Sequence, residues 1–188
     1  MDNYLLYTLF KFLHIAGAMA WIGGGVTLFA LSMFAMGRKD EAGMLEVLKH
    51  VGVLATRWFV PASLITLVCG LVMAFVGNLW SEAWVVLGLV GFAATFVTGH
   101  FGLRPFAEKI FRRASSGDIS GAVAEGRGML QVSKFDYTML FLIVADMVLK
   151  PQWNDFTVLA GFSTVLVAAV ITFLGPLLWA ERTPSAAQ

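Results

Sequence analysis

The chain has 188 residues, of which 59% are hydrophobic and only 13% charged, with a mean hydropathy of +0.79 and a formal net charge of +1. Soluble domains carry roughly 45–50% apolar and about 25% charged residues, so this composition disfavours a water-soluble enzyme, a nucleic-acid binder and a disordered protein. It predicts an all-α integral membrane protein. The length suits one bundle, and the single cysteine, Cys69, excludes an intramolecular disulfide.

Five apolar segments can be compared with the roughly 20 residues that a helix needs to cross the hydrocarbon layer. In chain order, the predicted spans are residues 5–36, 58–77, 84–103, 135–150 and 156–180. The fourth is short and holds Asp136 and Asp146, and we expect its helix to begin earlier, near Ile119. The prediction is one transmembrane domain over residues 1–182, followed by a disordered tail over residues 183–188.

Basic residues are concentrated in two long connections, residues 37–57 and 104–134, which we expect to be loops. The other two loops, 78–83 and 150–155, hold a single lysine between them. By the positive-inside rule the basic connections are cytoplasmic, which places the N-terminus outside and the C-terminus inside. Five spans agree with that parity.

Ionisable side chains are expensive inside a membrane and point to function, and the first span contains two of them. Lys11, His14 and Trp21 share one helix face. Small residues from Ala16 to Gly25 flank that face and leave space beside the histidine. This space admits either a closely packed helix or a flat macrocyclic cofactor with His14 as its ligand.

A second histidine, His100, ends the third span with glycine on both sides and Arg104 four residues further on. It is a candidate ligand or an interfacial structural residue. At 1.5 Å per residue, His14 and His100 are predicted to lie about 10 Å apart in depth, so one iron does not readily take both. Met73 and Met147 are alternative thioether ligands in the outer half of the membrane.

On the fourth span, Asp146 and Lys150 are spaced i, i+4 and can form an ion pair. Their predicted depth in the outer half, close to that of Lys11 and His14, also suits a proton relay through Asp146 or a site for an anionic group.

The segment from Lys11 to Gly24, with the pattern K-x-x-H-I followed by tryptophan and glycine, resembles the opening helix of the CopD-like membrane superfamily. This superfamily includes copper-resistance protein CopD, the HemJ-type protoporphyrinogen oxidases and uncharacterised small bacterial membrane proteins. The residues that match are Lys11, His14, Trp21, His100 and Lys150. The resemblance implies a four-helix core, here extended by a fifth helix, a b-type haem, and a location in the bacterial inner membrane.

Three functions follow as hypotheses. The first is a haem-b redox protein, which either passes electrons within the membrane or acts as an oxidoreductase on a hydrophobic, porphyrin-like substrate. His14 would bind the iron, and the candidate contacts to the cofactor or its propionates are Lys11, Trp21, Lys150 and Arg104. The second is an accessory subunit, in a homo-oligomer or a larger membrane redox complex. The third is copper transport or resistance, although the nine methionines are scattered.

Overall fold

The computed structural model describes residues 3–180, and every regular element in that range is a helix. The all-helical class is therefore confirmed, with 90% of the structure in helices. The predicted disordered tail lies outside the described residues. In chain order the α-helices are α1 (Asn3–Gly37), α2 (Glu41–Leu54), α3 (Val60–Val76), α4 (Ala83–Val97), α5 (Arg104–Ser115), α6 (Ile119–Leu149), α7 (Phe156–Ala169) and α8 (Gly175–Ala180).

Three π-helical segments connect α2 to α3, α4 to α5 and α7 to α8 without a break: Ala55–Phe59, Thr98–Leu103 and Val170–Leu174. Each of them ends two residues before a proline, namely Pro61, Pro105 and Pro176. A proline inside a helix has no N–H to donate, and its ring crowds the carbonyl one turn earlier. The wider π turn relieves that crowding, so the helices continue through these prolines.

Four helical segments are long and apolar enough to cross a membrane: Asn3–Gly37, Ala55–Val76, Ala83–Ser115 and Phe156–Leu177. They correspond to the first, second, third and fifth predicted spans. The fourth predicted span is part of α6, which begins at Ile119 as expected. α6 has 31 residues, or about 46 Å at 1.5 Å per residue, but its apolar part contains Lys134, Asp136 and Asp146.

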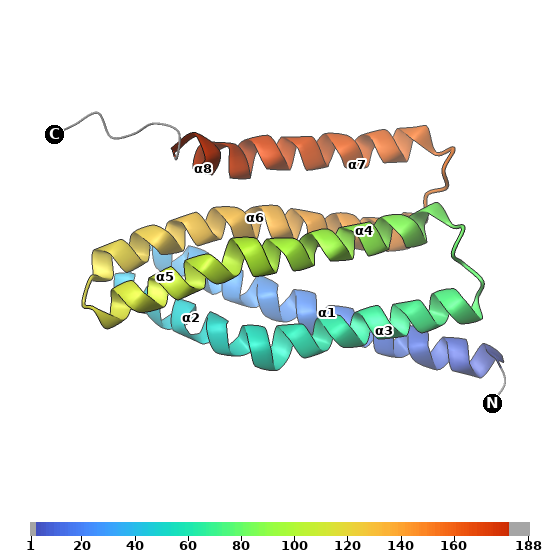
Figure 1. Cartoon of the computed structure of the whole chain (residues 1–188), viewed down its shortest axis with the longest axis horizontal. Helices are drawn as coiled ribbons and strands as arrows, with labels where there is room; N and C mark the ends of the chain where they lie inside the picture. The colour runs from blue at the N-terminus through green and yellow to red at the C-terminus, as the bar shows by residue number, and fades with distance from the viewer. Residues whose placement is uncertain (1–2, 181–188) are drawn as a thin grey trace.

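The long helices associate as two pairs, with α1 packed along α3 and α4 packed along α6. Figure 1 shows the two pairs side by side, with α7 and α8 running along the outside next to α6. Only 6% of the most apolar part of Phe156–Leu177 is buried. The C-terminal helix is thus an addition to the bundle rather than part of its interior.

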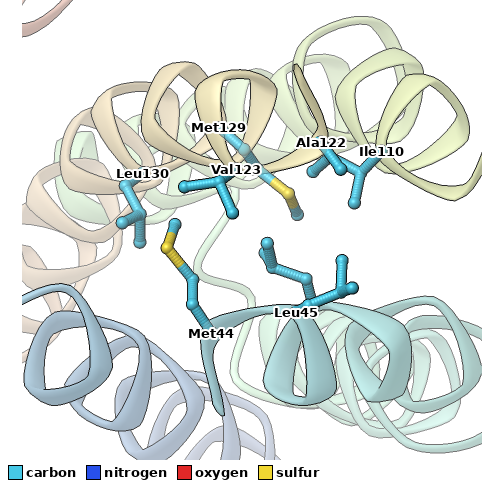
Figure 2. Packing of buried hydrophobic residues seen from close by; sticks show 8 residues of the cluster. Met44, Leu45, Ile110, Ala122, Val123, Met129 and Leu130 are labelled. Atoms are coloured by element: carbon cyan, nitrogen blue, oxygen red, sulfur yellow. The ribbon is translucent and has the colours of Figure 1, made fainter. Parts of the chain in front are cut away.

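One end of the bundle is closed by α2, α5 and the first turns of α6, and we call it the α2–α5 end. The opposite end, where α1 begins, we call the N-terminal end (Figure 1). A core of long apolar side chains fills the α2–α5 end, as Figure 2 shows. Its buried members are Met44, Leu45, Leu48, Ile110, Ala122, Val123, Met129 and Leu130.

Residues 37–57 and 104–118, the parts of the basic connections for which we expected no helix, are therefore mostly helical, and that expectation was wrong; the helix expected from about Ile119 is observed. Two aspartates stabilise the first turns of α2 and α6. Asp40 accepts a hydrogen bond from the backbone N–H of Gly43, and Asp118 accepts one from that of Gly121, both at 2.9 Å. Such N-caps satisfy donors that a helix start leaves free. Burial of one apolar face of each helix supplies the remaining stabilisation of these two segments.

Candidate functional site

His14 lies between α1 and α3, where it is half-buried. Its ring nitrogen Nδ1 is 2.7 Å from the backbone carbonyl oxygen of Thr66. A carbonyl oxygen can only accept a hydrogen bond, so Nδ1 carries the proton and donates it. In the neutral ring the lone pair of the other nitrogen, Nε2, is then available to a ligand. Imidazoles that bind metals are commonly oriented in this way, by a hydrogen bond from the other ring nitrogen to a backbone carbonyl.

Two glycines make this placement possible. A Cβ at Gly70 would lie 3.1 Å from both Cε1 and Nδ1 of His14, so the ring occupies space that any other residue would take. A Cβ at Gly17 would lie 2.7 Å from the hydroxyl oxygen of Thr66 and 3.2 Å from the carbonyl oxygen of Ala62. Close approach of α1 and α3 through these positions therefore holds His14 against the Thr66 carbonyl.

Trp21, which was predicted to share the His14 face, contacts a different helix. Its ring meets that of Phe92 on α4 edge to face, with centroids 5.6 Å apart, an arrangement favoured for aromatic pairs. This contact fixes the relative levels of α1 and α4. His14 is seven residues from it towards the N-terminal end, and His100 is eight residues from it in the opposite direction.

At 1.5 Å per residue, His14 and His100 thus lie about 22 Å apart along the bundle, roughly twice the separation expected from sequence. The reason is that α1 extends beyond α4 at the N-terminal end (Figure 1), whereas the expectation from sequence placed the outer ends of the first and third spans at one level. His100 is exposed and packs against the rings of Phe96 and Phe101. The structure does not bring the two histidines to one iron.

Asp146 is the most enclosed ionisable side chain of the candidate set, with 3% of its surface exposed. Neither carboxylate oxygen has a hydrogen-bond partner among the described residues. The ion pair with Lys150 that their spacing permits is not formed. The Lys150 ammonium lies instead over the ring of Trp84, 5.0 Å from its centroid, which is a cation–π contact.

The carboxylate faces α4, where a Cβ at Gly88 would lie 3.5 Å from its Oδ2. Gly88 is four residues from Phe92 in the direction of the N-terminal end. Measured from the Trp21–Phe92 contact towards that end, Asp146 therefore lies at about 6 Å and His14 at about 10 Å. Both polar groups therefore occupy the same part of the bundle, but on different helix pairs.

The other predicted site residues are distributed as follows. Lys11 is exposed on α1, one turn closer to the N-terminal end than His14. Met73 is half-buried on α3, three residues beyond Gly70. The methyl group of Met147 fills the space over Gly88, so this thioether packs between α4 and α6. Arg104 is exposed towards the α2–α5 end and pairs with Glu108 at 2.9 Å. It is not close to His14.

The sequence did not single out Thr66 or Gly70, because the Thr66 contribution is a backbone carbonyl and Gly70 is one glycine in an apolar run. Asp136 was noted, and its Oδ1 also lacks a hydrogen-bond partner within residues 3–180. Within that same range, no group of three histidine, cysteine, aspartate or glutamate residues is arranged to hold a metal ion.

The model of the family described as "Predicted integral membrane protein (DUF2269)" matches residues 8–151. This is well over half of the chain, from the first turns of α1 to the residues just after α6, and it stops before α7. No curated protein and no solved structure matches the chain. The chain therefore belongs to this family and is a multi-pass integral membrane protein.

Proposed function

We propose that this member of the family crosses the bacterial inner membrane five times, with α6 as the fourth span and the N-terminus outside. Two observations support the topology. α6 has the length to cross and lies alongside the four apolar helices (Figure 1). The basic residues gather at the α2–α5 end, whereas the loops at the opposite end, 78–83 and 150–155, contain Lys150 as their single basic residue. The positive-inside rule then makes the α2–α5 end cytoplasmic.

We further propose that the protein is a b-type haem redox protein with His14 as an axial ligand of the iron. The observation that carries this proposal is the 2.7 Å hydrogen bond from His14 Nδ1 to the Thr66 carbonyl, because it leaves Nε2 unprotonated in the neutral ring. When bound, the haem would supply one-electron chemistry, and the protein would supply the ligand and a dry surround. The CopD-like pattern from Lys11 to Gly24 supports the same cofactor.

The residues around His14 have roles in this proposal that follow from their positions. Lys11, one turn outward, is the candidate partner for a propionate, and Lys150 is a second at the same end of the bundle. Met73, on α3 three residues beyond Gly70, is the candidate second ligand and would bind the cofactor through its thioether sulfur. His100 and Arg104 lie too far towards the α2–α5 end to serve the same haem.

Asp146 is the proposed proton carrier. It is buried at nearly the depth of His14 and has no hydrogen-bond partner among the described residues. Oxidation of a hydrophobic, porphyrin-like substrate would release protons together with the electrons that the haem takes up, and a carboxyl group can accept such a proton. We expect Asp146→Asn to retain the haem and to weaken the pH dependence of its midpoint potential.

A reduced-minus-oxidised visible spectrum of the detergent-purified protein tests the haem assignment. We expect a b-type spectrum that is abolished in His14→Ala and retained in His100→Ala. His50→Ala is a second control, because His50 is exposed on α2 and its Nδ1 bonds the Glu46 carbonyl of its own helix. Gly70→Ala should perturb the spectrum without removing the imidazole. A full haem content in His14→Ala would contradict the proposal.

The alternative function is that of an accessory subunit, and one observation favours it. The C-terminal helix is barely buried, and a Cβ at Gly161 or Gly175 would meet nothing within 4 Å. Small residues on an exposed membrane helix suit close contact with another helix. A colourless protein that retains a defined partner in mild detergent, and loses it after Gly161→Leu, would support this role.

A further inference from the structure

At the α2–α5 end, the structure has a hollow of about 170 Å³ where the end of α1 meets α2 and α6. Its walls are partly apolar, from Met36, Met44 and Val123, and partly charged, from Lys39, Asp40 and Arg127. The Asp40 carboxylate already caps α2 through the Gly43 N–H. The hollow therefore carries two cations against one carboxylate that is already engaged by a backbone N–H, which leaves an excess of one positive charge.

Among the described residues, neither Lys39 nor Arg127 forms an ion pair. The charged contacts of this region join Arg104 to Glu108, Arg113 to Asp118 and Glu125, and His50, when protonated, to Glu46. Lys39 and Arg127, on two different elements, are both exposed. Two unpaired cations around one hollow can each bind a different oxygen of one anion, such as a phosphate group.

An apolar groove of about 430 Å³ lies on α1 beside this hollow. Ala30 and Gly37 are its small residues, the rings of Phe29 and Phe34 line it, and Arg38 lies at its end. A Cβ at Gly37 would meet nothing within 4 Å, so the space above it is open. Residues of the groove and of the hollow alternate over the last turns of α1, since Phe34 and Gly37 line the groove and Met36 lines the hollow, so both lie at this end of the helix.

We propose that this region binds one phospholipid with an anionic headgroup. Its phosphate lies between Lys39 and Arg127, with Arg38 as a third cation, and one acyl chain lies in the α1 groove. A soluble anion would use the cations but not the groove, whereas a lipid uses both. Their position at the end of a membrane-spanning helix is where headgroups meet acyl chains, and basic sites between helices bind anionic lipids there. The proposal is independent of any haem.

Lipid titration of the delipidated full chain in detergent tests the proposal, with retention measured by native mass spectrometry and by thermal stability. The probes are phosphatidylglycerol, phosphatidylcholine with the same acyl chains, and inorganic phosphate. We expect protection by phosphatidylglycerol. In the double variant K39Q/R127Q, its apparent dissociation constant should rise about thirtyfold, because each cation near a membrane surface contributes about 1 kcal/mol.

Arg112→Gln is the matched control, because Arg112 is also an exposed cation at this end but lies on α5, away from the hollow. Gly37→Leu fills the groove without changing charge and should also weaken phosphatidylglycerol binding, whereas Gly23→Leu, at another open position of α1, should not. Equal binding of the two lipids, or equal losses in K39Q/R127Q and Arg112→Gln, would overturn the site. Equal protection by inorganic phosphate would overturn the lipid assignment.

Discussion

The two ends of the bundle are held together by different contacts. At the α2–α5 end, long side chains from three helices interlock, and Met44, Ile110 and Leu130 are each less than 5% exposed. Towards the N-terminal end, the helices approach through glycines, and polar groups lie at their contacts. The first region resembles the core of a soluble protein, in which burial of apolar surface stabilises the fold. The second follows membrane packing, in which small residues permit close contact.

This comparison explains where function can reside. The interior of the interlocked core leaves no side chain free to bind a ligand, and the hollow proposed above for a lipid lies at the edge of that core. Glycine contacts leave space beside a backbone, and that space holds the His14 ring in one pair of helices and the Asp146 carboxylate in the other. Polar groups in such positions are costly in a membrane unless they are used. We therefore expect the two ends to respond differently to substitution.

The largest effect should come from truncation in the core of the α2–α5 end. Ile110→Ala removes a side chain that is 3% exposed and should cost about 2–5 kcal/mol of the free energy of unfolding, through lost burial and a cavity. Reversible unfolding in mixed micelles measures it. The matched control is Ile171→Ala, because Ile171 is 67% exposed on the C-terminal helix. Similar losses for the two variants would show that this end has no specific core.

A smaller effect should come from adding one methyl group between α1 and α3. Gly17→Ala places a Cβ 2.7 Å from the Thr66 hydroxyl and 3.2 Å from a backbone oxygen, and overpacking of this kind costs about 1–3 kcal/mol. Gly23→Ala on the same helix meets nothing within 4 Å and should stabilise by up to about 1 kcal/mol, because alanine favours helices. The same unfolding assay compares them. Equal effects would contradict close packing at Gly17.

Loss of one interhelical hydrogen bond should have a still smaller effect. The Trp58 indole Nε1 donates to the carbonyl oxygen of Ala20 at 3.0 Å. Trp58→Phe removes the donor and should cost about 0.5–1.5 kcal/mol. Trp80→Phe is the control, because the Trp80 indole has no hydrogen bond among the described residues. If both substitutions cost the same, the change in ring size rather than the hydrogen bond explains the loss.

The smallest effect concerns the exposed ion pair beside the start of α6. Arg113 donates a hydrogen bond to Asp118 at 2.8 Å, and this contact holds the pKa of the Asp118 carboxyl below its ordinary value of 3.8. A lowered pKa contributes stability that is complete above the ordinary value and is lost as the pH falls through the folded-state value. Wild type should therefore exceed Asp118→Asn slightly in unfolding midpoint near neutral pH. The difference should vanish in acid. A constant difference would exclude the ion pair as its cause.

Much of the fold is local and was accessible from the sequence. Apolar runs determined four of the spans, and the spacing of apolar residues after Asp118 placed the start of α6 at Ile119, as observed. Residues 37–57 and 104–118 are rich in charge, and their helices were not predicted. Their helices are amphipathic, and an apolar face stabilises a helix only when another helix covers it. That information is not contained in the segment itself.

The candidate site divides in the same way. The sequence alone determined that the chain enters a membrane and that His14 and Asp146 lie within its helices, because hydropathy and residue spacing are properties of each segment. Only the tertiary structure decided that His14 bonds the Thr66 carbonyl, that Lys150 covers Trp84 instead of pairing with Asp146, and that His100 lies at another level. Those outcomes depend on the register between helices, which is set by side-chain contacts between distant segments.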